Sequence, residues 1–295
     1  MQEKNHLLYN EFVTSILPKF NFRRVGFLIL FLILLSLIYI FGFIRPSNNR
    51  NWETGYEKIP KITLTGDQVS IQDLRDYHTF DGQTFFLGYV NRSVDISKLN
   101  QVWFIVEPFG DIPGSAHTYF VFDFAGQDPL AISIEARREK GEKFNILSGT
   151  FNSYELIYVW SSEQDATIRR VFSQHNKLYM YPLKITQNGA QRLFLQLVQS
   201  TQELEQHPRF YNTFTSNCTN ELAKSANKVK PNAIPLDIAY LMPGYSPQLL
   251  YRLGYLPQDR PLTELTKKSY LNEIVKKIFN QPDFSHQSRV ALQST

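Results

Sequence analysis

The chain has 295 residues, 43% of them hydrophobic, and a net charge of +4 from 31 Lys and Arg against 27 Asp and Glu. Its mean hydropathy is −0.28, yet residues 25–44 form an uninterrupted apolar run without a charge. This distribution excludes a multi-span membrane protein, a disordered chain and a disulfide scaffold. The small, scattered charge does not favour nucleic acid as a partner.

The apolar run predicts a transmembrane helix, because about 20 residues in a helix cross the hydrocarbon core of a bilayer. No small-residue cleavage site follows it, which favours an uncleaved anchor over a signal peptide. Arg23 and Arg24 directly precede the run, and they favour a cytoplasmic N-terminus although the basic residues on its two sides tie in number. We therefore expect a cytoplasmic tail (1–24), an anchor (25–44), a linker (45–62), one large domain (63–257) and a C-terminal helical extension (258–295).

The part after the anchor predicts an α+β fold with strands first and helices after them. Runs rich in aromatic and β-branched residues predict strands at 84–90, 102–106, 117–124, 130–137, 154–160 and 178–185. Apolar spacing predicts helices at 190–204 and 262–279, and another beginning at Ser216 or Asn217. Four prolines in 231–247 predict a loop or lid. Apolar residues of segment 231–255 fit a groove, a surface that dips into a membrane interface, or ordinary core: Ile234, Leu241, Met242, Leu249 and Leu250.

The single cysteine, Cys218, cannot form an intrachain disulfide. Its expected place is the first turn of a helix, where the helix dipole favours a thiolate and lowers the pKa of the thiol. Backbone N–H groups at that position could also receive the oxyanion of an acyl-transfer intermediate. An inert buried thiol is an equal alternative.

A nucleophilic thiol needs a base, and His117 is the candidate among six histidines. It begins a predicted strand just after the turn at 111–114, a position typical of catalytic residues, although a structural histidine fits as well. On the next predicted strand Ser133, Glu135 and Arg137 share one face. Glu135 could orient His117 or pair with Arg137. There is no zinc-ligand spacing and no phosphate-binding glycine pattern, so we expect neither a metal nor another cofactor.

Several segments, in order and spacing, resemble the bacterial periplasmic domain family typified by the lipoprotein N-acyltransferase Lnb. The resemblance covers residues 66–227. That family is similar to circularly permuted papain-like (NlpC-like) thiol enzymes of the lecithin:retinol acyltransferase-like branch, with an antiparallel sheet and a cysteine-bearing helix. The segments that carry the resemblance are Val106–Phe109, Ala116–Thr118, Ser133–Arg137 with 138–142, Tyr154–Tyr158 with Glu163, Asp165 and Arg169, Tyr181–Leu183, Phe210–Asn212 and Ser216–Thr219.

The resemblance implies Cys218 as nucleophile and His117 as base, to which we add Glu135 as an orienting residue. Four further residues are expected to bind substrate or support the site: Asn217, Thr219, Tyr119 and Arg137. The acidic and basic residues that match the family could equally form structural ion pairs; besides Arg137 they are Glu155, Glu163, Asp165 and Arg169.

The implied function is N-acylation of the terminal diacylglyceryl-cysteine of bacterial lipoproteins through a Cys218 thioester. Its acyl donor would be a phospholipid or a glyceryl ester, and the protein would be anchored in the inner membrane with its catalytic domain in the periplasm. Alternatives are a papain-like amidase or peptidase acting on cell-wall peptides, and a non-catalytic anchored binding module.

Overall fold

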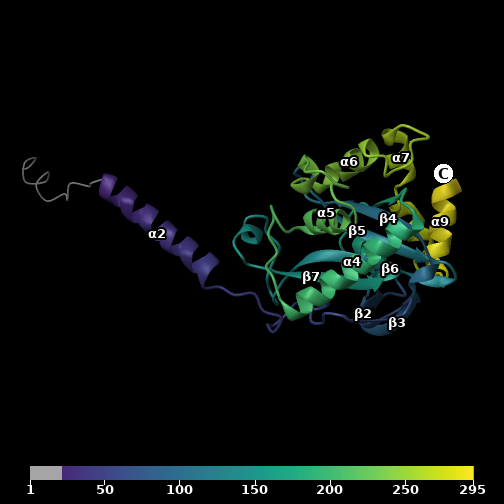
Figure 1. Cartoon of the computed structure of the whole chain (residues 1–295), viewed down its shortest axis with the longest axis horizontal. Coiled ribbons are helices and arrows are strands. Elements are labelled where there is room, and N and C mark those ends of the chain that lie inside the picture. Colours follow the sequence, from purple (N-terminus) through teal and green to yellow (C-terminus); the bar gives the residue numbers. More distant parts are fainter. Residues whose placement is uncertain (1–21, 295) are drawn as a thin grey trace, which may run out of the picture. The chain divides into compact units, whose positions relative to one another are not determined.

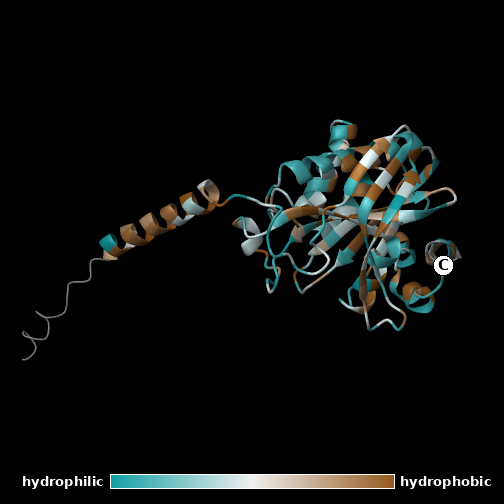
Figure 2. Ribbon diagram, turned by 90° about the horizontal axis from the view of Figure 1, so that it is seen from below, coloured by the Kyte–Doolittle hydropathy of each residue, from teal (hydrophilic) through white to brown (hydrophobic). Residues whose placement is uncertain are grey.

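The computed structural model describes residues 22–294 and divides into two compact units, Met1–Arg45 and Pro46–Thr295. In the first unit the helix α2 (Phe22–Gly42) buries none of its side chains, and Figure 2 shows apolar residues along nearly all of it. Among the described residues, α2 alone is long and apolar enough to cross a membrane, as an anchor or as a signal sequence. The expected cytoplasmic tail lies, up to residue 21, outside the described residues.

The second unit is built on an eight-stranded sheet with the order β1-β2-β7-β6-β5-β4-β8, in which β3 pairs with β2 (Figure 1). Every pairing is antiparallel except the short parallel one between β2 and β7. The strands are β1 (Lys61–Thr65), β2 (Gln68–His78), β3 (Phe86–Asp95), β4 (Leu99–Pro108), β5 (Ala116–Phe124), β6 (Gln127–Arg137), β7 (Glu155–Ser162) and β8 (Tyr179–Pro182).

Helices follow the main strands along the chain, which confirms the predicted mixed α+β class with a mostly antiparallel sheet. The α-helices of this unit are α3 (Glu163–Phe172), α4 (Gln187–Gln206), α5 (Cys218–Val229), α6 (Ser246–Arg252), α7 (Leu262–Lys268), α8 (Asn272–Ile278) and α9 (Phe284–Ser294). Short 3-10 turns are η1 (Ile96–Lys98), η2 (Ser148–Thr150), η3 (Ile238–Tyr240) and η4 (Pro243–Tyr245).

The sheet has a hydrophobic core on each face. Phe120 and Phe122 of β5 point to the core shared with α4 and α5, whereas Tyr119 and Val121 point to the core shared with α3, α8 and α9. Because successive side chains of a strand face opposite sides, a central strand covered on both faces contains consecutive apolar residues, as residues 119–122 of β5 do. The predicted strand at 117–124 is therefore covered on both faces.

The six predicted strands are all present, but β1, β2, α3 and α6 were not predicted. Strand β2 carries a bulge between Ile71 and Leu74, with Asp73 at a positive φ of 59°, and this bulge interrupts the apolar alternation. The prediction of one helix over 262–279 was wrong, because the helix is interrupted between α7 and α8. There Leu271 N–H donates to the carbonyl of Leu178, and Tyr270 pairs with Tyr179 at the start of β8.

Residues 45–62 were expected to be a linker. From Pro46 onward they instead pack as part of the second unit. Trp52 and Tyr56 are buried against Ile157 and Val159 of β7. Backbone hydrogen bonds join this segment to the end of β6, including one from Glu53 N–H to the carbonyl of Arg138. The segment is therefore part of the second unit. Two aromatic residues within a polar stretch were the only signal of this packing.

Candidate active site

The start of α5 fixes the position of Cys218. Of the two N-caps that the sequence allowed, the structure has Asn217, whose Oδ1 accepts from the N–H of Asn220 at 2.9 Å. The Asn217 amide also donates to the carbonyls of Thr213 and Tyr240, both at 2.8 Å. Cys218 is thus the first residue of the helix, with 6% of its surface exposed. Asn217 supports the site by holding this helix start between two loops.

Cys218 meets β5 where that strand separates from β6. The ladder between the strands begins at Tyr119 and Ser133, although both strands continue beyond this pair. Thr118 lies next to the Cys218 sulfur, and hydrogen bonding from its backbone and its side chain lowers the pKa of the thiol. A buried contact of 2.9 Å between the hydroxyls of Thr118 and Thr219 joins β5 to α5. Thr219 therefore positions the helix that carries the thiol.

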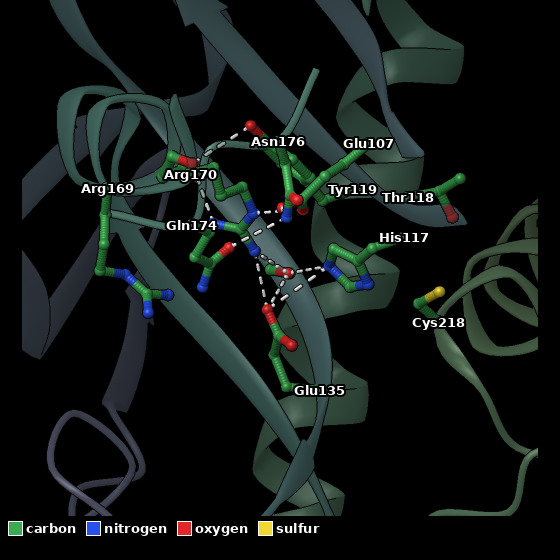
Figure 3. A network of polar contacts seen from close by, with 12 residues as sticks. Glu107, His117, Thr118, Tyr119, Glu135, Arg169, Arg170, Gln174, Asn176 and Cys218 are labelled. Atoms are coloured by element: carbon green, nitrogen blue, oxygen red, sulfur yellow. Dashed lines mark hydrogen bonds and ion pairs between the residues drawn. The ribbon is translucent and has the colours of Figure 1, made fainter. Parts of the chain in front are cut away.

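His117, at the start of β5, lies between Cys218 and a pair of polar residues from β6 (Figure 3). Its Nε2 is 2.6 Å from the Ser133 hydroxyl and 3.4 Å from Glu135 Oε1. Ser133 in turn donates to Glu135 Oε1 at 2.7 Å. Because Nε2 is directed at β6, Nδ1 is the ring nitrogen left for Cys218. Glu135 thus acts on His117 both directly and through Ser133, a role of Ser133 that the sequence did not reveal.

Charges around the pair favour a thiolate and an imidazolium. Burial opposes the charged form of His117, but Glu135 and Cys218 outweigh it and raise the pKa of His117 to about 9. Burial likewise opposes the thiolate, yet His117 and the hydrogen bonds from Thr118 lower the pKa of Cys218 below its ordinary value. The pKa of Glu135 would rise with burial, but His117 and Arg170 lower it to about 2. The site therefore stabilises the charge separation that a thiol nucleophile needs.

Arg170 of α3 supplies the cation behind Glu135, and the sequence analysis missed it. Its side chain is 2% exposed and donates to Glu107 Oε2 at 2.7 Å, Glu135 Oε1 at 2.8 Å and Ser133 at 3.2 Å. Asn176 donates to the second oxygen of Glu107 at 2.6 Å, so the network joins β4, β6 and α3 (Figure 3). The one signal in the sequence was the adjacent pair of arginines on α3, of which the resemblance selected Arg169.

Of two other residues predicted to support the site, Tyr119 lies beside His117, whereas Arg137 does not. The Tyr119 ring is stacked on the His117 ring at 6.0 Å between centroids, and the Arg170 guanidinium lies 4.6 Å from the same Tyr119 ring. Arg137 does not pair with Glu135. Its guanidinium lies 4.1 Å from the Trp52 ring and donates to the backbone carbonyls of Tyr56 and Glu57. Arg137 therefore holds the first residues of the unit on the sheet, away from the thiol.

Three acidic residues that matched the resemblance take part in ion pairs outside the thiol site. Asp165 pairs with Arg75 in a fully buried contact, Glu163 pairs with Arg289 of α9, and Glu155 pairs with Arg50. These pairs join segments that are far apart in the chain. They agree with the structural alternative that the sequence left open.

A cavity of about 530 Å³ opens beside Cys218, His117 and Glu135, and its walls include Leu241 and Met242. Its size is typical of small-molecule sites. A second cavity of about 340 Å³ lies on another side of α5. Apolar residues that line the second cavity are Phe104, Phe120, Leu193, Leu222, Ile234, Leu249 and Leu250. The apolar residues of segment 231–255 thus divide between the two cavities.

These observations define an α+β domain in which a lone cysteine and a histidine meet beside a cavity. A family model described as the Lnb N-terminal periplasmic domain matches residues 86–244, more than half of the chain. The chain belongs to this family, which confirms the resemblance, and His117, Glu135 and Cys218 all lie in the matched range. No curated protein and no solved structure matched the chain. The permuted papain-like relationship therefore stays a prediction.

Replacing Ser133 tests its role as a positioning residue for His117. Because Ser133→Ala removes the hydroxyl between Nε2 and Glu135, we expect it to slow alkylation of Cys218 by about tenfold or more at neutral pH, the effect of losing a hydrogen bond to a charged group. Ser133→Thr retains the hydroxyl and should restore most of the rate. Circular dichroism should show both variants folded, and equal alkylation rates in wild type and Ser133→Ala would remove Ser133 from the site.

Proposed function

We propose that this protein is a membrane-anchored cysteine acyltransferase that N-acylates the terminal diacylglyceryl-cysteine of bacterial lipoproteins. The observation that carries the proposal is the Cys218–His117 pair beside the 530 Å³ cavity. Membership of the Lnb N-terminal periplasmic domain family adds support, because the family resemblance of the sequence implies lipoprotein N-acylation. The proposal includes a permuted papain-like fold, in which a histidine strand precedes the cysteine helix.

In the first half of the reaction Cys218 takes up the acyl group. His117 accepts the proton of the thiol, and the sulfur attacks the carbonyl carbon of an acyl ester, forming a C–S bond. The resulting oxyanion accepts hydrogen bonds from the backbone N–H groups of Cys218 and Thr219, which at the first turn have no acceptor within the helix. The C–O bond then breaks, the His117 imidazolium gives its proton to the departing alkoxide, and a thioester remains.

In the second half the acyl group passes to the lipoprotein. The α-amine attacks the thioester carbonyl and forms a C–N bond, and His117 accepts the proton that the amine loses. The C–S bond breaks, Cys218 leaves as a thiolate and the product is an amide. Glu135 and Ser133 hold the imidazole in place through both halves, and Arg170 fixes Glu135. No oxidant, reductant or cofactor enters this sequence.

The proposal also assigns the topology. The helix α2 would serve as a single-pass anchor in the inner membrane, with the N-terminus in the cytoplasm and the second unit in the periplasm. The acyl donor would be a phospholipid or a glyceryl ester, and both are membrane components. An anchored enzyme meets such substrates at a high effective concentration.

Expression in cells deprived of their own lipoprotein N-acyltransferase tests this function. Mass spectrometry of lipoprotein N-termini should show an amide-linked acyl chain on the α-amine with the wild-type protein and none with Cys218→Ser or His117→Ala at equal membrane levels. Lipoproteins whose α-amine remains free while the wild-type protein is folded and membrane-bound would contradict the proposal. Cleaved cell-wall peptides in place of acylated lipoproteins would favour the amidase alternative.

The pKa shifts predict how thiol reactivity depends on pH. The folded-state pKa of Cys218 is lowered, so the thiolate persists to a lower pH than in the unfolded chain and is lost only as the pH falls through the lowered value. Iodoacetamide alkylation should therefore have its midpoint below that of the urea-unfolded chain, about 8.5. His117→Gln removes the imidazolium and should raise the midpoint. A folded-state midpoint at or above the unfolded one would show that the pair does not form.

A further inference from the structure

Exposed apolar side chains gather at the mouth of the Cys218 cavity. Interior wall residues such as Ala116 and Ile134 are buried. The outer wall instead contains large hydrophobic residues whose surfaces are 36–54% exposed. We call these residues the apolar rim: Ile112, Phe144, Ile146, Phe214, Ile238 and Leu241. A contiguous exposed patch of this kind at a cavity mouth marks a surface that meets a partner or a membrane.

The apolar rim is held in place by backbone contacts between four separate loops. Thr213, next to Phe214, donates through its hydroxyl to the carbonyl of Ile146 at 2.8 Å. On the other side, Gly244 N–H donates to the carbonyl of Gly114 at 2.8 Å. Gly114 has a φ of +83°, and a Cβ there would lie 2.7 Å from the Tyr245 ring, so this close approach requires glycine. The loops thus present their apolar residues from fixed positions.

All but one of these loops join the same end of the sheet. β4 ends and β5 begins there, with Pro108 opposite Ala116, and the loop between them carries Ile112. β6 ends and β7 begins there, with Arg137 opposite Glu155, and the loop between them carries Phe144 and Ile146. An isolated bridge between Glu155 and Phe210 brings the segment that carries Phe214 to this end.

The first residues of the second unit attach at this end as well. Ser47 N–H donates to Glu155 Oε1 at 3.1 Å, and Arg137 donates to Asn48 Oδ1 at 3.3 Å. Only residues 43–45 separate the last residue of α2 from Pro46 in the sequence. The chain that comes from the candidate membrane helix therefore enters the second unit at the end of the sheet that carries the apolar rim. This attachment favours a bilayer over a soluble partner.

We propose that the apolar rim docks into the interface of the membrane that holds α2, so that the Cys218 cavity opens onto lipid. Ile112, Phe214 and Leu241 enter the boundary between headgroups and acyl chains, and a lipid ester reaches the thiol without crossing water. The inference deepens the proposed function and rests on it for the substrate. Docking itself needs no catalysis, so the two can be tested separately.

Fluorescence quenching by lipid tests docking in the full-length protein reconstituted into phosphatidylcholine vesicles. The three native tryptophans, Trp52, Trp103 and Trp160, are buried. Phe214→Trp and Leu241→Trp place a reporter on the apolar rim, and Leu64→Trp is the matched control, because Leu64 is 50% exposed on the strand β1 outside the rim. All variants carry Cys218→Ala so that no reaction occurs. Comparison of vesicles with and without lipid brominated near the headgroup gives the quenching.

The expected result is a loss of fluorescence for both rim reporters and little loss for the Leu64→Trp control, because docked interfacial side chains lie about 5–10 Å into the boundary. Equal quenching at all three positions overturns the proposal. The proposal is also overturned if the rim reporters are not quenched because a second copy or another protein covers the rim, which crosslinking would reveal. If docking is observed but the α-amine of lipoproteins stays free, the proposed function fails alone. If lipoproteins are acylated without docking, this inference fails alone.

Discussion

Cys218→Ala should reduce acyl transfer to a diacylated lipopeptide by at least about 1,000-fold, because the substitution removes the sulfur that carries the acyl chain in the proposed mechanism. The substitution removes one buried sulfur atom and its interaction with His117, so the free energy of unfolding should change by only about 1 kcal/mol. Mass spectrometry of the lipopeptide product and urea unfolding measure the two effects.

Ser225→Ala is the matched control for this substitution. Ser225 is also a buried small residue of α5, and its hydroxyl donates to the carbonyl of Glu221 within the helix. The control variant should keep its activity with a similar small change in stability. If Cys218→Ala and Ser225→Ala transferred acyl groups equally well, the thiol would not be the nucleophile.

Arg170→Met should destabilise the fold by about 3–5 kcal/mol, the usual effect of leaving buried charges without their partner. Glu107 and Glu135 would lose contacts of 2.7 and 2.8 Å with the guanidinium. Because Arg170 helps to lower the pKa of Glu135, that pKa should rise in the variant. The loss of stability relative to wild type should therefore shrink in acid, where a protonated Glu135 no longer bears an uncompensated charge. Urea unfolding at neutral and acidic pH measures both effects.

The control for Arg170 is the exposed pair of Lys276 and Glu273 on α8. Lys276→Met should change the free energy of unfolding by no more than about 0.5 kcal/mol, because exposed ion pairs contribute little. Glu107→Gln in the Arg170→Met background should recover part of the lost stability by removing one unpaired charge. A loss of less than about 1 kcal/mol in Arg170→Met would contradict the buried network.

Local signals explain what the sequence could predict. The strand runs and the helix start at Asn217 depend on residues next to one another, and residues 119–122 of β5 are consecutive apolar residues because both faces of the strand are covered. The family could be predicted because its motifs recur in a fixed order. The contact between Cys218 and His117 was a consequence of that resemblance, since nothing local joins residues 101 positions apart in the sequence.

The remaining features depend on tertiary packing. Arg170 looks like a solvated helix residue in the sequence, and only the packing of α3 on the sheet buries it beside Glu107 and Glu135. The position of Ser133 between His117 and Glu135 follows from the separation of β5 and β6 at Tyr119. The break between α7 and α8 follows from the pairing of Tyr270 with Tyr179. Each depends on a contact between elements that no local pattern encodes.

Trapping of the acyl-enzyme tests the central claim most directly. The full-length protein is incubated with vesicles that contain phospholipid and a diacylglyceryl lipopeptide with a blocked α-amine, so that both kinds of donor are present without an amine acceptor. The peptide that contains Cys218 is then analysed by mass spectrometry. The account predicts one acyl chain on Cys218, released by hydroxylamine as a thioester is, and no adduct in His117→Ala. Transfer of an acyl chain to a lipopeptide while Cys218 stays unmodified and Cys218→Ala remains active would contradict it.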